Sequence, residues 1–316
     1  MAKPLTRVAR RIARAMGYEL LRQQKTTIHD ESVTGLGRGG GLDAFEVVVP
    51  REVAAFDIYF RSCARVDVHA QSRARFNGAP KSEIVTRCLV SLGRSIAYAR
   101  DHGESVPMSL TVLDDHSDPE SVEKIRAALS SVPVETGFLT IEGTGPGISM
   151  AEACRKARDQ ARDIYYIVED DYLHDERAVL EVVASYRRLA GMLHQDIMLF
   201  TADYPDFYRN VRPTQVLLGS HRHWRRIDSV TFSHIASKKI LTRYWDKFIM
   251  LERYGEDPDL TEANSINKVV EQVPTFAPLP ALAAHFQHFE TMSPFFDWEK
   301  WWENSRLVDA PETETP

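Results

Sequence analysis

Short apolar runs and longer helical patterns alternate along the chain as far as residue 169. Three runs rich in β-branched and aromatic residues predict strands buried on both faces, at residues 56–60, 108–113 and 164–169. Between them, residues 82–100 carry apolar side chains at helical spacing, and Asp118 followed by Pro119 marks another helix start. This alternation predicts an α/β fold with a mostly parallel sheet and helices on both faces.

The pattern then becomes less regular. A short strand within residues 134–141 leads into a glycine-rich loop, and Ser149 with Glu152 forms a capping box that predicts the next helix start. Residues 197–201 predict one more strand, residues 215–235 predict shorter antiparallel strands, and residues 260–270 predict a helix. The second part of the fold is therefore expected to be smaller and antiparallel.

Positive charge is concentrated at the N-terminus of the chain. Residues 1–25 hold seven basic residues and one acidic residue, a net of +6; because the whole chain carries −6, the remainder carries −12. Leu5, Val8, Ile12 and Met16 fall at helical spacing, which predicts a basic amphipathic helix. Such a helix can bind an anionic membrane surface; the alternatives are a helix docked on the acidic body of the protein itself, or a mobile basic tail.

Composition narrows the class of protein further. A net charge of −6 excludes a generally basic chain that coats nucleic acid. No apolar run approaches the ~20 residues needed to span a bilayer, and three scattered cysteines indicate a reducing compartment. We predict a basic helix and glycine-rich linker at residues 1–44, a catalytic domain at 45–308 and a disordered tail at 309–316. The expected location is the cytoplasm, with a peripheral position on the inner face of the cell membrane.

Candidate chemistry begins where the strand at 164–169 ends, in Glu169-Asp170-Asp171. Three consecutive carboxylates repel one another unless a cation lies among them. Mg²⁺ and Mn²⁺ take oxygen ligands, and Mg²⁺ commonly binds through one or two carboxylates plus substrate phosphates. Ligands of open α/β sheets bind outside the carboxyl ends of the strands. The motif therefore predicts a metal-assisted phosphate site, and the alternative is a solvated acidic loop.

Two further segments with polar or glycine-rich character follow strands. Asp114 and Asp115 come at the end of the strand at 108–113, where an aspartate can accept hydrogen bonds from a base or a ribose. In the loop at 143–147, Gly145 and Gly147 would let the backbone approach an anion at the start of a helix; a plain turn is the alternative. Together the three strand ends are expected to hold the nucleoside, the phosphates and the metal.

These segments together resemble glycosyltransferase family 2. Residues 110–118, LTVLDDHSD, are similar to its "DDxSxD" element, and residues 169–171 resemble its "DxD" metal-binding signature in the EDD form. The resemblance covers roughly residues 50–290 and implies a GT-A fold, a nucleotide-diphosphate sugar donor, and Mn²⁺ or Mg²⁺. It assigns the following roles: nucleoside and donor contacts to Asp114, Asp115, Arg61, Gly145, Gly147 and Asp170, and metal ligation to Asp171 and Asp170.

The second half of the chain resembles the family less closely. Residues 255–260 are similar to its "ED" element, in which Asp257, or else Glu256, would act as general base; the alternative is an acidic helix N-terminus. The family's "QxxRW" element is absent, which favours transfer of single sugars over processive synthesis. His285 is a candidate metal ligand, because some GT-A enzymes bring a histidine from this half to the metal, or it is a hydrogen-bonded core residue.

The predicted function is metal-dependent transfer of one sugar from a nucleotide-diphosphate sugar to a glycan or lipid-linked acceptor, in surface polysaccharide synthesis. No nucleic acid partner is expected, and an anionic membrane surface is a further candidate partner. Two alternatives stay open. One is a sugar-phosphate nucleotidyltransferase, although such enzymes carry a glycine-rich loop after the first strand that is not present here. The other is a non-catalytic, membrane-associated scaffold with a degenerate fold.

Overall fold

The computed structural model describes residues 49–65, 78–209, 214–254, 256–257, 259–287 and 291–307. The predicted N-terminal helix and linker, residues 1–44, and the predicted tail, residues 309–316, lie outside the described residues. None of the helices in the described part of the chain combines the length and the apolarity needed to cross a membrane.

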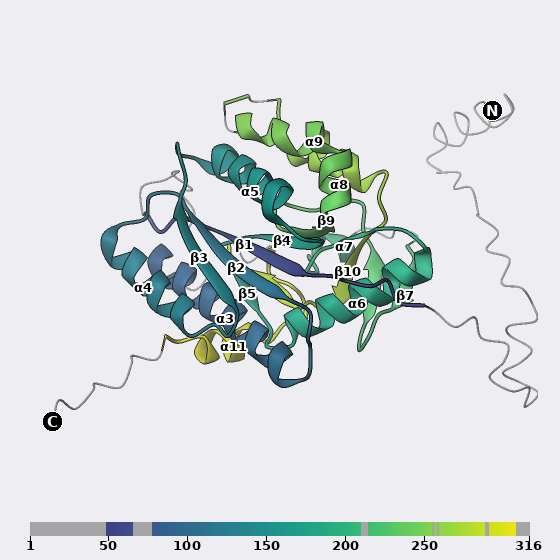
Figure 1. Ribbon diagram of the computed structural model, residues 1–316, viewed down its shortest axis with the longest axis horizontal. Helices are drawn as coiled ribbons and strands as arrows, with labels where there is room; N and C mark the ends of the chain where they lie inside the picture. Colours follow the sequence, from purple (N-terminus) through teal and green to yellow (C-terminus); the bar gives the residue numbers. More distant parts are fainter. Residues whose placement is uncertain are drawn as a thin grey trace, which may run out of the picture. The chain divides into compact units, whose positions relative to one another are not determined.

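Four parallel strands form the first half of the central sheet, in the order β3-β2-β1-β4 (Figure 1). They are β1 (Phe56–Ser62), β2 (Met108–Asp114), β3 (Glu135–Thr140) and β4 (Ile164–Glu169). β1 is buried along its whole length and β4 along all but its last residue, whereas β3 forms the exposed edge. The apolar runs thus form strands covered on both faces, as their composition predicts.

Helices cover both faces of this parallel half. α5 (Pro146–Gln160) packs against β1 and β4 on one face, together with α8 (Lys238–Arg243) and α9 (Trp245–Ile249). On the other side lie α3, α4 and α6 (Figure 1). Their bounds are Lys81–Asp101, Pro119–Ser130 and Ala178–Leu193. The predicted α/β class is confirmed by this layered arrangement.

The remaining strands extend the sheet mostly in antiparallel fashion, in the order β4-β9-β6-β10-β8-β7. They are β6 (Met198–Leu199), β7 (Val216–Leu218), β8 (His223–Arg226), β9 (His234–Ser237) and β10 (Thr275–Leu279). Of the pairs they form, only β6 with β10 is parallel. The smaller antiparallel part that the sequence predicts is therefore present.

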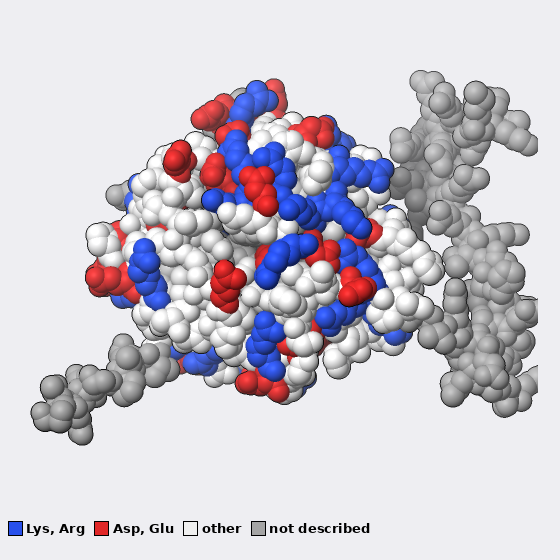
Figure 2. All heavy atoms as spheres, in the orientation of Figure 1, with Lys and Arg blue, Asp and Glu red and all other residues white. Residues whose placement is uncertain are grey.

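Short elements connect and close the fold beside this sheet. A separate two-stranded sheet pairs β5 (Tyr172–His174) with β11 (Ala283–His285), which brings residues 171 and 285 together. The short helices are α7 (Asp206–Arg209), η3 (Met250–Arg253), η4 (Glu262–Asn264), α10 (Ile266–Val270) and α11 (Trp298–Asn304). On the face in Figure 2, lysines and arginines gather over α5 and α8, so the charge is uneven within the folded part as well.

Two predicted elements differ from the structure. α5 begins at Pro146 and not at the predicted capping box, because the Ser149 hydroxyl accepts a hydrogen bond from Arg61 instead of capping the helix. The helix predicted at 260–270 breaks into η4 and α10. The break is at Ser265, whose φ of −118° and ψ of −103° are not helical, and the side chain of Asn264 caps the start of η4 by bonding to the Thr261 backbone.

Candidate active site

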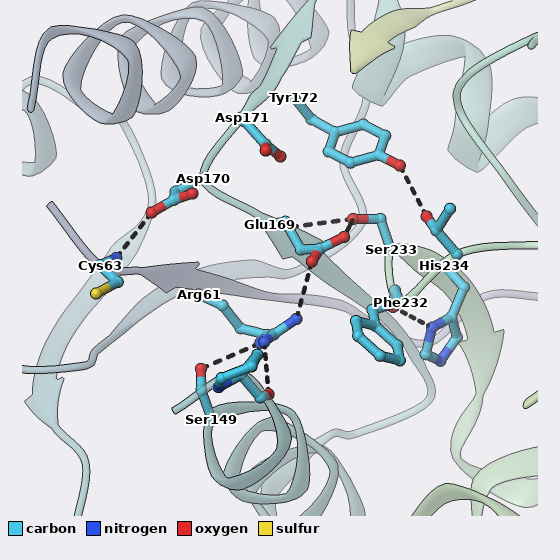
Figure 3. Close-up of polar contacts among 12 residues, drawn as sticks. Arg61, Cys63, Ser149, Glu169, Asp170, Asp171, Tyr172, Phe232, Ser233 and His234 are labelled. Atoms are coloured by element: carbon cyan, nitrogen blue, oxygen red, sulfur yellow. Dashed lines mark hydrogen bonds and ion pairs between the residues drawn. The ribbon is translucent and has the colours of Figure 1, made fainter. Parts of the chain in front are cut away.

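The β4 acids, Glu169, Asp170 and Asp171, stand where β4 reaches the carboxyl edge of the sheet. Although they are consecutive, their side chains point in three directions (Figure 3). Each meets a different basic residue, and the three basic residues come from distant parts of the chain: Arg61, Lys81 and His285. The repulsion among the neighbouring carboxylates is therefore offset by protein groups of opposite charge.

Glu169 pairs with Arg61, which lies near the end of β1. The Arg61 Nη1 to Glu169 Oε1 distance is 3.4 Å, and the Arg61 side chain is only 7% exposed. Arg61 also donates to Ser149 Oγ at 3.1 Å and to the Pro146 carbonyl at 2.9 Å, both in the first turn of α5. Burial raises the pKa of the Glu169 carboxyl, and Arg61 opposes that shift. In this structure Arg61 ties α5 to the end of β4, and its contact with a donor stays a prediction.

Asp170 turns toward the start of α3. Its Oδ2 accepts a hydrogen bond from the Cys63 backbone N–H at 2.7 Å, and its Oδ1 forms an ion pair with Lys81 Nζ. Burial raises the pKa of the Asp170 carboxyl, whereas Lys81 acts to lower it. Both carboxylate oxygens therefore have protein partners here. The predicted roles of Asp170 in metal or ribose binding would require it to exchange one of them.

Lys81 is the residue of this site that the sequence analysis missed. It is the first residue of α3, where its positive charge meets the positive end of the helix dipole. A residue that conflicts with its local structure is typical of a functional site, and Asp170 relieves the conflict here. The sequence feature that could have identified Lys81 as a site residue is therefore a lysine directly after Pro80, at a predicted helix start.

Asp171 faces His285, which the pairing of β5 with β11 brings to the same place. The Asp171 Oδ1 to His285 Nε2 distance is 3.3 Å, and the His285 side chain is 8% exposed. Burial acts to lower the pKa of the His285 imidazole, but Asp171 outweighs it and the pKa is raised. Burial acts to raise the pKa of the Asp171 carboxyl, but His285 outweighs it and the pKa is lowered. The two residues thus stabilise each other's charged forms.

The pair of Asp171 and His285 fits one side of a divalent-cation site. Asp171 Oδ1 is buried without a well-oriented hydrogen bond, which leaves that oxygen with spare capacity to bind a cation. Mg²⁺ often binds through one or two carboxylates plus substrate phosphates, so few protein ligands suffice. Among the described residues, no cluster of three or more His, Cys, Asp and Glu side chains could hold a metal. A cation held by Asp171 and His285 would therefore take its remaining ligands from water or from a bound molecule.

Asp114 and Asp115, here called the β2 acids, lie at the end of β2 and are almost fully buried. Asp114 accepts hydrogen bonds from the Ser62 hydroxyl at 2.7 Å and from the Ser117 N–H and hydroxyl at 2.9 and 2.6 Å. Asp115 Oδ1 accepts from Arg65 at 3.1 Å. In this structure the β2 acids hold loops together, and their predicted contact with a nucleoside is not tested by these bonds.

The glycine-rich loop is fastened to the same strand end. The Gly145 N–H donates to Asp115 Oδ2 at 2.8 Å, and Gly145 has a φ of 106°, which only glycine adopts readily. A Cβ on Gly147 would lie 2.6 to 2.8 Å from carbonyl oxygens of the segment that includes η3, residues 251–254. Gly147 therefore permits the close packing of α5 on η3. Donor binding by either glycine stays a prediction.

The candidate base, Asp257, lies in a turn beyond η3 rather than at a helix N-terminus. Its Oδ2 is 3.3 Å from Arg253 Nη2, and its Oδ1 accepts a hydrogen bond from the Asp259 N–H at 3.1 Å. Within the described parts of the chain, neither Asp257 nor Glu256 forms an ion pair or hydrogen bond with the β4 acids. Tyr254 connects this segment to the site, because its ring meets Phe232 at 4.8 Å and Phe232 lies under the Arg61 guanidinium.

The fold and the site define an α/β protein with a cluster of paired charges at the carboxyl edge of its parallel strands. No protein-family model and no curated protein sequence matches the chain. Solved structures with a similar arrangement include residues 1–349 of TarS from S. aureus, with a TM-score of 0.42 and 15% identity. That match covers 71% of this chain and 57% of that chain, so the chain spans less than two thirds of the TarS structure.

Two further structures are similar to the chain. Glucosyl-3-phosphoglycerate synthase from Mycobacterium tuberculosis, in complex with Mn²⁺, UDP and glucosyl-3-phosphoglycerate, has a TM-score of 0.33 and 12% identity, covering 71% of this chain and 65% of that one. UTP-bound UGPase from Acinetobacter baumannii has a TM-score of 0.45 and 10% identity, covering 82% of this chain and 95% of that one.

Proposed function

We propose that the protein is a glycosyltransferase that moves a single sugar from a nucleotide-diphosphate sugar to an acceptor hydroxyl. The observation that carries this proposal is the meeting of Asp171 and His285 at the carboxyl end of β4, 3.3 Å apart. A carboxylate and an imidazole facing each other at this edge suit a divalent cation, and the neighbouring Lys81 and Arg61 add positive charge for a diphosphate.

Mn²⁺ or Mg²⁺ would be held by Asp171 and His285, with Asp170 able to join if Lys81 releases it. When bound, the cation supplies charge neutralisation on the departing nucleoside diphosphate. Lys81 and Arg61 would orient the diphosphate by charge-assisted hydrogen bonds. The nucleoside would lie over the neighbouring strand end, beside the β2 acids and Gly145.

The acceptor hydroxyl needs a base, and Asp257 is the proposed one, with Glu256 as the second candidate. Asp257 is partly exposed and is held by Arg253, so it can receive a proton at the surface of the site. The proposed acceptor is a glycan or a lipid-linked glycan in surface polysaccharide synthesis. The absence of a "QxxRW" element in the sequence supports single-sugar transfer.

Residues 1–25 are proposed to hold the protein on the inner face of the cell membrane through their net charge of +6. Binding that is mainly electrostatic requires anionic lipid and weakens with salt. Deleting residues 1–25 should therefore release the protein from anionic vesicles and leave turnover of a soluble acceptor unchanged. Equal vesicle binding by the two forms would refute the anchor.

A panel of nucleotide-diphosphate sugars, each with and without Mn²⁺, tests the proposed activity. We expect one donor to raise the melting temperature only when Mn²⁺ is present, and the same donor to be hydrolysed slowly. The Asp171→Asn variant should lose both effects. Formation of a nucleotide sugar from UTP and a sugar 1-phosphate would show a nucleotidyltransferase instead. The absence of any nucleotide binding would favour a scaffold.

A further inference from the structure

His285 is fixed by a chain of hydrogen bonds that runs away from the β4 acids. Its Nδ1 lies 2.8 Å from Tyr204 Oη, which lies 2.6 Å from Tyr172 Oη, and Tyr172 Oη in turn lies 2.8 Å from Thr231 Oγ1. The imidazole also stacks on the Tyr172 ring, with the centroids 4.6 Å apart and the planes at 15°. The ring is therefore restrained both in its position and in its rotation.

The hydrogen bonds along this chain can all be made with an imidazole proton on His285 Nδ1. Each tyrosine or threonine hydroxyl has one proton to donate. If His285 Nδ1–H donates to Tyr204, then Tyr204 donates to Tyr172 and Tyr172 donates to Thr231, so every hydroxyl that donates has an acceptor. The other nitrogen, Nε2, then faces Asp171 Oδ1 at 3.3 Å. Metal-binding histidines are usually fixed in this way, with the second ring N–H donated to an oxygen.

Two other buried histidines also meet tyrosine hydroxyls but are arranged differently. His234 Nε2 lies 3.0 Å from Tyr165 Oη, and its Nδ1 is bonded to a backbone carbonyl at 2.9 Å. His174 Nε2 lies 3.1 Å from Tyr166 Oη. Of these three tyrosine-bonded histidines, only His285 also faces a carboxylate at a strand end. A tyrosine partner is thus common in this core. Specific to His285 among the three is a second ring nitrogen that faces a carboxylate, where a cation would displace the proton between them.

We propose that Tyr204 and Tyr172 are positioning residues that hold His285 in the tautomer and orientation in which Nε2 binds a divalent cation beside Asp171. The inference rests on the proposed function, because the cation belongs to it. In this role the two tyrosines act only through the imidazole. Removing an outer hydrogen-bond partner of a metal-binding histidine typically costs about 10- to 100-fold in metal affinity.

The test is a titration of the full-length protein with Mn²⁺ at saturating UDP. Binding is measured as the loss of the electron paramagnetic resonance signal of free Mn²⁺. We expect Tyr204→Phe to weaken Mn²⁺ binding about 10- to 100-fold. Tyr172→Phe should weaken it as well, because Tyr204 loses its acceptor. Tyr165→Phe is the matched control, since it removes a tyrosine hydroxyl bonded to a buried histidine outside the site, and it should leave Mn²⁺ affinity unchanged.

A second measurement separates positioning from general damage. Raising the Mn²⁺ concentration should restore donor turnover in Tyr204→Phe, because the ligand is still present, whereas His285→Ala should not recover. If Tyr204→Phe and Tyr172→Phe both bind Mn²⁺ within about twofold of the wild-type affinity, the inference about the tyrosines is overturned and the proposed function stands. A wild-type protein that binds no Mn²⁺ with UDP would overturn the proposed metal dependence, and the inference with it.

Discussion

Two acidic strand ends of this protein are similar in sequence, but the carboxylates at the two ends differ in their hydrogen-bond partners. At the end of β2, Asp114 takes all of its hydrogen bonds from neutral groups, the Ser62 hydroxyl and the Ser117 N–H and hydroxyl. At the end of β4, each acid instead meets a basic residue brought from a distant segment, such as Lys81 or His285. Asp115, beside Asp114, does pair with a basic residue, Arg65, at 3.1 Å, so the contrast is carried by Asp114. Asp114 holds two loops together through neutral bonds, whereas the β4 acids form a cluster of balanced charges.

The difference lies in what a ligand could replace. A buried carboxylate that accepts three neutral hydrogen bonds has little to gain from a cation, and losing those bonds would release the loops. A carboxylate paired with a single basic group can exchange that partner for a metal or release it to a phosphate. An apolar strand followed by two aspartates is thus insufficient to identify a metal site. The hydrogen-bond and ion-pair partners of the carboxylates determine whether a cation can bind there.

The largest expected effect comes from removing one charge at the end of β4. Asp171→Asn keeps the shape of the side chain and removes the carboxylate that faces His285, so Mn²⁺-dependent donor turnover should fall by at least about 100-fold. Turnover at a series of Mn²⁺ concentrations measures the loss, and circular dichroism checks the fold. A folded variant with near-normal activity at limiting Mn²⁺ would contradict the assignment of Asp171.

The sequence predicted both acidic strand ends because each is a local pattern, an apolar run followed by carboxylates. It also predicted the start of α4, since Asp118 and Pro119 act on their own helix, and the side chain of Asp118 does accept a bond from the Ser121 N–H. The directions of the β4 acids could not be predicted, because their partners lie far away; Lys81 is 89 residues from Asp170. For the same reason Ser149, a capping residue by its local pattern, is bonded to Arg61 instead.

Two buried histidines near β4, His174 on β5 and His234 on β9, give a second contrast, which depends on pH. Burial lowers the pKa of His174 to about 3 and that of His234 to about 4, below the ordinary value of about 6.5 expected when unfolded. Between pH 6.5 and 4 the unfolded chain therefore binds protons that the native protein does not. Stability should fall as the pH falls through this range, by up to about 1.4 kcal/mol per pH unit for each histidine.

Urea unfolding of the metal-free protein between pH 6.5 and 4.5 measures this dependence. His234→Gln removes one titrating group, so the slope of unfolding free energy against pH should become shallower, even if the variant is less stable overall. Tyr165→Phe is the control, because it alters the partner of His234 and leaves both histidines in place. A slope that His234→Gln does not change would mean that this histidine is already charged in the native protein.

At the β2 acids the expected effect falls on stability rather than on metal binding. Asp114→Asn places an amide NH₂ among the hydroxyl and N–H donors of Ser62 and Ser117, so at least one buried donor is left without an acceptor. We expect a loss of about 3 kcal/mol of unfolding free energy. Mn²⁺ affinity at saturating UDP should stay near that of the wild type. If a stable Asp114→Asn variant loses much of its Mn²⁺ affinity, the end of β2 also contributes to metal binding, and the proposed difference between the two strand ends is wrong.

The smallest effect concerns the glycine-rich loop beside the β2 acids. A Cβ on Gly147 would come within 2.6 Å of the Glu252 carbonyl oxygen, so α5 and η3 must move apart. We expect Gly147→Ala to cost about 1 to 2 kcal/mol of unfolding free energy, in the lower part of the range for overpacking. Gly137 is the matched control, because a Cβ there meets only the Thr111 side chain, at 3.4 Å and beyond, and Gly137→Ala should be close to neutral.

UDP affinity, measured on the same two variants, distinguishes packing from donor binding at this loop. If Gly147 serves the contact between α5 and η3, Gly147→Ala loses stability and binds UDP about as well as Gly137→Ala once both are folded. If the loop instead brings its backbone against the phosphates, the methyl group obstructs the ligand, and UDP affinity falls by more than the lost stability accounts for. The second result would make the loop part of the donor site, so that the β2 end would no longer serve only to hold loops together.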